Sequence, residues 1–364
     1  MKIAFLSNSY GEDHSGALIG QKIKNLHPKI KIIAFPLISF GEEYQKRGID
    51  VIGGNTPPPS GGFLLKSLAK LVKDIIETFP APFSYIKRVH EFKDEIDLAI
   101  VVGDVPLLIM GWIALRRKEY FLAPCKSDWI APHLKVEKII MQRLTEVVFT
   151  HDELTASNLR EKGVNAIFLG NPMMDGLNRE NKYHPPEGST LIGILPGSRE
   201  ESYGNMKKIS KVVEILSSRD KNLNFAVALS ETADKERMMK SLDGVNSEIE
   251  LVEGGFVDIL KSSKLVISLA GTASEQAVGL GIPVVSFSGS GAQTTKRRLL
   301  GQKKLLGEAF TYLEYEPKRI AKKIQEILDD KELKNLMKRN GIKRMGPPGG
   351  AKRIAEFILE KEGI

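Results

Sequence analysis

The stretch "LVISLAGTASEQAVGLGIPVVSF", Leu265 to Phe287, carries the pattern that decides the fold. Two short apolar runs, typical of buried strands, flank a turn of small residues and a segment of helical character. The first turn of a helix leaves N–H groups unpaired and partly positive, and small residues let an anion approach them. The pattern predicts either a phosphate site, with Glu275 or Gln276 near ligand hydroxyl groups, or an ordinary connection capped by Thr272. A phosphate beside sugar hydroxyls would indicate a nucleotide ligand.

The same alternation of strand and helix continues on both sides of this stretch. We expect strands over 2–7, 30–35, 98–102, 120–123, 146–150, 166–169, 191–195, 224–228 and 249–251. We expect helices over 17–24, 133–143 and 205–217. Such alternation is typical of doubly wound α/β domains, which bind ligands at the carboxyl ends of their strands.

A polar break divides the alternation into two parts. "GNPMMDGLNRENKYHPPEGST", Gly170 to Thr190, is interrupted by Pro, Gly and Asn and is typical of a linker. The last helix, about 350–364, follows a Gly/Pro break and is expected to cross back onto the first part. The predicted fold is therefore α/β with two Rossmann-like domains facing a cleft: 1–170 with about 350–364, and 171–349.

Composition narrows the class of protein. The 364 residues contain one cysteine, which excludes a disulfide framework and a cysteine-based zinc cluster. The histidines show no metal-ligand spacing, and the start of the chain lacks the features of a secretory signal, so we expect no metal, no cofactor and an intracellular location. The net charge of +8 favours an anionic partner. Because no nucleic-acid-binding motif is present, we expect that partner not to be nucleic acid.

One segment suggests contact with a membrane. Between Pro57 and Arg88, apolar residues recur at helical spacing from Leu64 to Ile76, and Lys66, Lys70 and Lys73 flank them. A basic amphipathic helix can lie in a membrane interface, where its lysines meet anionic lipids. A helix that packs on the core with solvated lysines would show the same pattern, so both interpretations remain open.

Several other loops that follow strands carry groups capable of chemistry. "ILPGSREE", 194–201, presents Ser198 and Arg199, and a guanidinium there suits phosphate recognition. In "EGGFVDIL", 253–260, Phe256 is placed to hold a flat base. Asp104 in "LAIVVGDVP" is either a general base or a helix N-cap, and His14 in "YGEDHSGA" is a second candidate base.

Together these motifs resemble the lipid-A-disaccharide synthase family, in the order "GEDHSGA", "VVGDVP", "GNPMMD", "LPGSRE", "AGTASEQA" and "IPVVSF". The similarity is greatest to the branch described as synthase-related. The resemblance implies a GT-B fold and an inverting glycosyltransferase that uses a UDP-sugar, of the N-acetylglucosamine or acyl-glucosamine type, and a lipid or lipid-linked acceptor. It implies a peripheral location at the cytoplasmic membrane face and contact with the membrane through about 63–88, and it is compatible with a homodimer.

The resemblance also implies roles for individual residues. Asp104 matches the family's catalytic aspartate, and Arg199 matches the arginine that closes L-P-G-S-R. The residues expected at the substrates are Gly11, Glu12, Ser15, Gly16, Gly197, Ser198, Phe256, Gly271, Thr272, Ala273, Glu275, Gln276 and Gln293. The chain departs from the family pattern at Ala17, Leu107, Asn171 and Gln276. Two alternatives stay open: a non-hydrolysing UDP-sugar 2-epimerase, and a basic membrane- or nucleic-acid-binding protein without catalysis.

Overall fold

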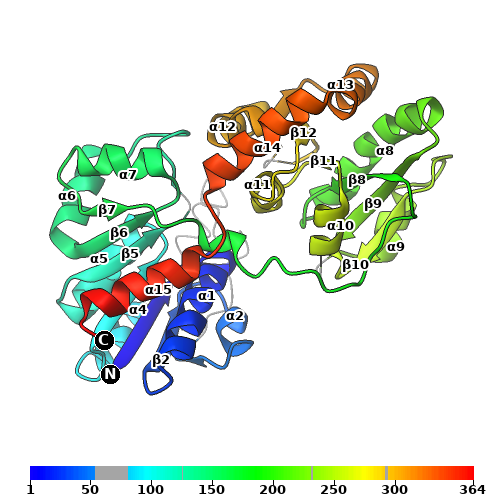
Figure 1. The fold of residues 1–364 in the computed structure, drawn as a ribbon. Coiled ribbons are helices and arrows are strands. Elements are labelled where there is room, and N and C mark those ends of the chain that lie inside the picture. The colour runs from blue at the N-terminus through cyan, green and yellow to red at the C-terminus, as the bar shows by residue number, and fades with distance from the viewer. Residues whose placement is uncertain (54–80, 125, 231–232, 292–293) are drawn as a thin grey trace. The chain divides into compact units, whose positions relative to one another are not determined.

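The computed structural model describes residues 1–53, 81–124, 126–230, 233–291 and 294–364 (Figure 1). The chain divides into two compact units. Unit 1 comprises Met1–Asp175 and Pro348–Ile364, and unit 2 comprises Gly176–Pro347. The divisions therefore fall at 175/176 and 347/348, against the expected 170/171 and 349/350. Most of the predicted membrane segment, and Gln293, lie outside the described residues.

Unit 1 contains a parallel sheet of seven strands in the order β3-β2-β1-β4-β5-β6-β7. Its strands are β1 Lys2–Ser7, β2 Lys31–Pro36, β3 Asp50–Val51, β4 Leu98–Val102, β5 Glu119–Ala123, β6 Thr145–Thr150 and β7 Ala166–Ile167. Its helices are α1 Tyr10–Leu26, α2 Glu42–Gln45, α4 Ala81–Glu91, α5 Val105–Leu115, α6 Lys135–Leu144, α7 Glu153–Arg160, the 3-10 helix η1 Pro172–Met174 and α15 Gly350–Lys361.

The strands of unit 1 are buried on both faces, as continuous apolar runs such as "LAIVV" require. One core, which includes Phe5, Ile100 and Ile354, lies between the sheet and the pair α1 and α15. A second core, which includes Leu6, Val101 and Leu108, lies under α4 and α5. Figure 1 shows α15, in red, beside α1, in blue, so the expected return of the last helix to the first unit is observed.

Unit 2 contains a parallel sheet of six strands in the order β10-β9-β8-β11-β12-β13. Its strands are β8 Thr190–Leu195, β9 Leu223–Leu229, β10 Glu250–Glu253, β11 Leu265–Ser268, β12 Val284–Phe287 and β13 Phe310–Leu313. Its helices are α8 Glu201–Arg219, α9 Lys235–Lys240, α10 Phe256–Ser262, α11 Thr272–Gly279, α12 Lys296–Leu306, η2 Gly307–Ala309, α13 Pro317–Asp329 and α14 Lys331–Met345. Both units are doubly wound parallel α/β domains, which confirms the predicted fold class, the GT-B type.

One expectation about local structure was wrong, whereas the predicted linker contains the division between the two units and is ordered at one end. Helix α1 begins at Tyr10 rather than near Ala17, so the expected glycine-containing loop is the first part of a helix. The predicted linker from Gly170 is ordered at its beginning, because buried Asp175 accepts hydrogen bonds from the backbone N–H groups of Gly349 and Ala351. Asp175 thereby joins this segment to the start of α15. None of the described helices has the length and apolar character needed to cross a bilayer.

Candidate functional site

The predicted phosphate loops of unit 2 follow neighbouring strands at the point where the strand order reverses. The chain runs outward from β8 through β9 to β10, and then returns to β11 on the other side of β8. In such sheets, ligands bind in the crevice at the carboxyl ends of the two central strands. The Leu269 N–H donates to the Leu195 carbonyl at 2.8 Å, so the two loops leave the sheet side by side.

The loop after β8 places Ser198 and Arg199 at the surface. Gly197 adopts φ +108°, a conformation that other residues rarely adopt, and this turn brings the next two side chains out of the sheet. Buried Asn205 on α8 fixes the loop from below. Its Nδ2 donates to the Pro196 carbonyl at 2.9 Å, and its Oδ1 accepts from the Ser290 N–H at 2.7 Å. Asn205 therefore ties the loops after β8 and β12 to the same helix.

The loop after β11 opens helix α11. Gly271 is the N-cap and no side chain caps the helix, so the alternative of a capping Thr272 was wrong. The hydroxyl groups of Ser268 and Ser274 lie 2.7 Å apart, and Gln302 Nε2 donates to the Gly271 carbonyl at 3.0 Å. A Cβ built on Gly271 would meet no described atom within 4 Å. The helix N-terminus is thus held in place and approachable.

The other predicted contacts of unit 2 are distributed around this crevice. Ala273, Glu275 and Gln276 are half-buried on the first turns of α11. Phe256 is the first residue of α10, after β10, and is half-buried rather than part of an open loop. The predicted groups that lie nearest one another are therefore those in the loops after β8 and β11.

Unit 1 has the same reversal of strand order between β1 and β4. Asp104 follows β4, is exposed, and is the N-cap of α5, where its Oδ1 accepts from the Leu107 N–H at 3.1 Å. One carboxylate oxygen thus caps the helix, and the side chain still reaches solvent. The N-cap and general-base interpretations of Asp104 are compatible with each other.

The predicted residues after β1 lie on α1. Gly11 is exposed, whereas Glu12, Ser15 and Gly16 are buried, and Glu12 accepts a hydrogen bond from Ser9 Oγ at 2.5 Å. His14 is half-buried and its Nδ1 lies 2.6 Å from Glu43 Oε2. The contact with Glu43 orients the ring and leaves Nε2 as the nitrogen that could accept a proton, so His14 stays a candidate base.

Asp13, the residue between Glu12 and His14, is a buried carboxylate with a raised pKa at this edge of the sheet. It is 1% exposed, and its two oxygens accept hydrogen bonds from Ser7 and Ser39. Burial raises the pKa of Asp13 to about 6 from 3.8, although the hydrogen bonds from Ser39 and Ser7 lower it. Asp13 joins the end of β1, helix α1 and the loop after β2.

Asp13 predicts a pH dependence of stability. Because its folded pKa is raised, the folded state holds the proton more tightly than the unfolded state does, so stability present below pH 3.8 is lost as pH rises to about 6. This loss amounts to roughly 3 kcal/mol in the free energy of unfolding. The D13N variant has no carboxyl group at this position, so this pH-dependent contribution to stability is absent from it. We expect the stability of wild type minus that of D13N to fall between pH 3.5 and 7.5 in urea unfolding.

The matched control is E43Q. The hydrogen bond from His14, with those from Lys46 and Arg47, holds the pKa of Glu43 well below its usual range despite burial. Stability from Glu43 is therefore present above about pH 4.5 and lost on acidification, the opposite sign. A difference between wild type and D13N that does not change with pH would contradict the role given to Asp13.

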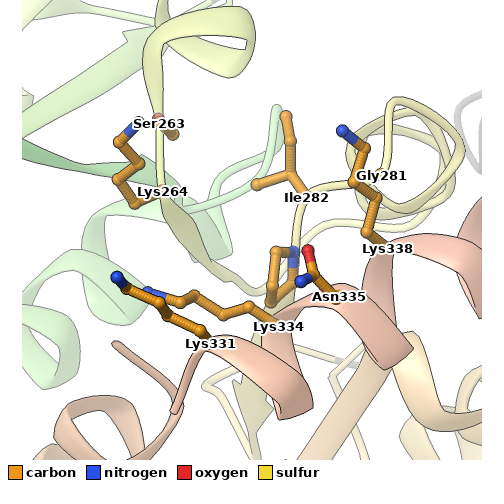
Figure 2. Close-up of a pocket in the computed structure, with 9 residues that line it drawn as sticks. Ser263, Lys264, Gly281, Ile282, Lys331, Lys334, Asn335 and Lys338 are labelled. Carbon is orange, nitrogen blue, oxygen red and sulfur yellow. The ribbon is translucent and has the colours of Figure 1, made fainter. Parts of the chain in front are cut away.

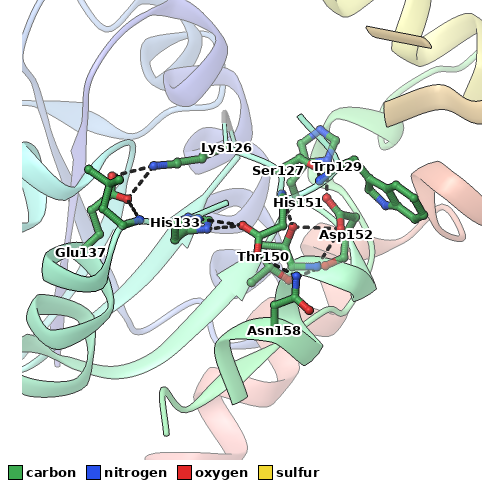
Figure 3. A network of polar contacts seen from close by, with 12 residues as sticks. Lys126, Ser127, Trp129, His133, Glu137, Thr150, His151, Asp152 and Asn158 are labelled. Carbon is green, nitrogen blue, oxygen red and sulfur yellow. Dashed lines mark hydrogen bonds and ion pairs between the residues drawn. The ribbon is translucent and has the colours of Figure 1, made fainter. Parts of the chain in front are cut away.

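A second polar network, which the sequence did not reveal, lies after β5 and β6 (Figure 3). His133 and Asp128 are 1% exposed in their side chains, with Nδ1 and Oδ1 2.7 Å apart. Asn158 donates to the other oxygen of Asp128 at 2.9 Å, and Asp152 caps α7 through the Thr155 N–H at 2.9 Å. The network fixes two further loops at the carboxyl edge of unit 1. The sequence indicates this network only through two polar segments, "SDWIAPH" and "THDELT", at the ends of strands.

Burial alone would raise the pKa of Asp152, but hydrogen bonds from His151, Ser127 and the Thr155 amide lower it below its usual value. The network therefore holds a carboxylate in its charged form inside the unit. Within the described ranges, no three or more His, Cys, Asp and Glu side chains are grouped so that they could hold a metal ion.

Comparison with known proteins identifies relatives over most of the chain and a family model for its central part. A family model described as lipid-A-disaccharide synthetase matches residues 156–287. Lipid-A-disaccharide synthase 1 of Legionella pneumophila (strain Paris) is 20% identical over 287 residues, which cover 75% of this chain and 71% of that protein. The lipid-A-disaccharide synthase of Trichlorobacter lovleyi is 22% identical over 335 residues, covering 84% and 86%.

Solved structures share the fold over nearly the whole chain. UDP-GlcNAc 2-epimerase from Neisseria meningitidis, bound to UDP-GlcNAc, has a TM-score of 0.67 at 17% identity and covers 99% of this chain and 100% of that one. CalG4, the calicheamicin glycosyltransferase, has a TM-score of 0.69 at 14% identity and covers 99% and 98%. These structural likenesses support the GT-B fold. The matches in sequence confirm the resemblance seen in the motifs: the chain is similar to lipid-A-disaccharide synthases.

Proposed function

We propose that the chain is an inverting glycosyltransferase that moves a sugar of the N-acetylglucosamine or acyl-glucosamine type from a UDP-sugar to a lipid or lipid-linked acceptor. The observation that carries this proposal is the family match over residues 156–287, because that range contains both loops at the β8/β11 reversal. The open N-terminus of α11 and the exposed Arg199 suit the diphosphate of such a donor.

The proposed reaction needs a base for the acceptor hydroxyl and groups that stabilise the departing UDP. Asp104 accepts the proton of the acceptor hydroxyl while that oxygen attacks the anomeric carbon of the donor sugar. The bond between this carbon and the UDP oxygen breaks from the opposite face, so the configuration inverts. Arg199, Ser198 and the N–H groups at the start of α11 stabilise the negative charge that develops on the departing UDP.

The nature of the acceptor is inferred from the surface of unit 1. The described end of the 57–88 segment is the start of α4, where Phe83 is 69% exposed. An exposed aromatic residue at the end of a basic amphipathic segment suits an interface with lipid. We therefore propose that the acceptor is presented at a membrane surface.

The test measures donor binding and transfer separately. We expect calorimetry to show binding of UDP and UDP-N-acetylglucosamine and weaker binding of GDP and ADP. Transfer of labelled sugar from the donor to extracted membrane lipids would then identify the acceptor. If UDP does not bind in the presence or absence of anionic vesicles, the proposal fails.

A second candidate is the non-hydrolysing UDP-sugar 2-epimerase, because the epimerase from Neisseria meningitidis shares the fold over nearly its whole length. That reaction needs no acceptor. Conversion of UDP-N-acetylglucosamine to its 2-epimer by the purified protein alone, followed by NMR, would favour it. The sequence relatives reported above are synthases, so we expect no conversion under these conditions.

A further inference from the structure

A hollow in unit 2 lies at the end of the sheet opposite to the proposed donor site (Figure 2). It has a volume of about 430 Å³ and is formed by the chain entering β11, the chain entering β12 and one face of α14. Ser263 and Lys264 precede the first residue of β11, and Pro283 precedes that of β12. The donor loops, in contrast, leave the carboxyl ends of β8 and β11. The hollow is therefore separate from the donor site.

Four lysines line this hollow. Lys331, Lys334 and Lys338 follow one another at spacings of three and four residues, which places them on one face of α14. Figure 2 shows Lys264 across the hollow from Lys331 and Lys334. The described residues that line the hollow include no carboxylate. Four like charges around one space repel one another, and a bound anion would relieve this repulsion.

The lysines are not used by ion pairs within the described structure. No carboxylate among the described residues lies in ion-pair range of Lys264, Lys331 or Lys338. Lys334 donates to the Leu328 carbonyl at the end of α13. Asp330, the acid next to Lys331 in the chain, caps α14 by accepting from the Leu333 N–H at 2.9 Å. These ammonium groups thus remain available to a ligand.

The helix that carries three of the lysines is fixed in position. Gly341 on α14 lies against the backbone of α11, where a Cβ would come within 2.3 Å of the Val278 carbonyl oxygen. Backbone contact this close leaves α14 little room to shift, so its lysine face is held before any ligand binds. Ile282 and Pro283 add an apolar wall, and Asn335 adds an amide.

We propose that this hollow, the lysine pocket, lined by Lys264, Lys331, Lys334, Asn335 and Lys338 beside Ile282, binds a compact polyanion with at least two phosphate groups. Its volume lies within the range of small-molecule sites, and lysine is a common phosphate ligand. Such a ligand is either a soluble phosphate compound or the headgroup of an anionic lipid. This inference does not depend on the proposed glycosyltransferase activity.

The test uses inorganic tripolyphosphate, with orthophosphate for comparison, and the full chain. We expect calorimetry to show tripolyphosphate binding in wild type and in R199A, which alters the donor loop. We expect the affinity to fall at least about tenfold in K264Q/K331Q/K338Q, since each lysine contributes at an anionic group. Lys334 is kept because it bonds to α13, and glutamine preserves helix propensity.

The matched control, K211Q/K318Q/K322Q, removes three lysines that are exposed elsewhere on unit 2 and so changes the net charge equally. Equal loss in the control and the pocket variant, or undiminished binding in the pocket variant, would overturn the proposal. So would the absence of tripolyphosphate binding together with no binding to vesicles. Vesicles of phosphatidylcholine with phosphatidylglycerol are compared with phosphatidylcholine alone, in wild type and in the pocket variant. Loss of vesicle binding in the pocket variant but not in the control indicates a lipid headgroup, whereas unchanged vesicle binding with loss of tripolyphosphate binding indicates a soluble ligand.

Discussion

Arg199→Ala is expected to lower the kcat/KM of sugar transfer by about 10²–10³-fold, the range found when one group that stabilises a developing anion is removed. Arg199 is exposed on the loop after β8, so its removal leaves the core of unit 2 intact. We expect the free energy of unfolding to change by no more than about 0.5 kcal/mol. Kinetic assays with a fixed acceptor and varied UDP-sugar, together with urea unfolding, measure both quantities.

Two further variants make the Arg199 result specific. Arg199→Lys keeps the charge but loses the planar pair of donors, so we expect an intermediate rate. Arg237 is the matched control, because it pairs with Glu200, next to Arg199, and its guanidinium lies 4.2 Å from the centre of the Tyr203 ring. We expect R237A to transfer sugar within about threefold of wild type. Equal losses in R199A and R237A would show a general effect of charge or loop structure, and the role of Arg199 would be withdrawn.

The strand–turn–helix pattern predicted the local structure of β11 and α11 well because its signals are local. The apolar run at Leu265–Ser268 and the small residues after it set the strand, the turn and the start of α11 within one short stretch. The capping residue was wrong, since Gly271 takes that position and Thr272 is the first helical residue. A choice between adjacent residues depends on backbone angles, which sequence patterns do not specify.

The start of α1 in unit 1 was predicted less well because its structure depends on distant contacts. The sequence 10–16 contains glycines and charged residues, which favour a loop, but the structure forms the first turns of α1 there. Asp13 is buried in this helix through hydroxyl groups at Ser7 and Ser39, and Ser39 is 26 residues away in the chain. Local propensity does not report a partner at that separation, so neither the helix nor the raised pKa was foreseen.

The lysine pocket shows the same limit. A basic, weakly amphipathic stretch such as "KELKNLMKRNGIKRM" predicts a surface helix with solvated lysines. Only the packing of α14 on α11, with Gly341 against Val278, places three of its lysines beside Lys264. The sequence shows that this stretch is positively charged, but it does not show that three of its lysines lie beside Lys264.

Asp104→Asn is expected to lower kcat by about 10²–10⁴-fold while leaving the fold intact. This variant removes the proposed role of the side chain as a base but keeps its role as a helix cap. As the N-cap of α5, Asp104 accepts one hydrogen bond from the Leu107 N–H at 3.1 Å. Asparagine caps helices about as well as aspartate, so stability should change little. An amide cannot take a proton from an acceptor hydroxyl, so transfer should fail. Asp104→Ala should lose about 1 kcal/mol of stability as well.

The surroundings favour Asp104 over the other candidate bases of unit 1. Asp13 is 1% exposed and occupied by two hydroxyl groups, and Glu12 is 8% exposed. His14 is held by Glu43 at 2.6 Å. Asp330→Asn is the matched control, because Asp330 is also an exposed N-cap and accepts from Leu333 at 2.9 Å. We expect D330N to transfer sugar at the wild-type rate. If D104N did so too, we would look for the base in the 11–14 segment. There His14 is more exposed than Glu12 and Asp13, so H14Q would then be expected to lose transfer.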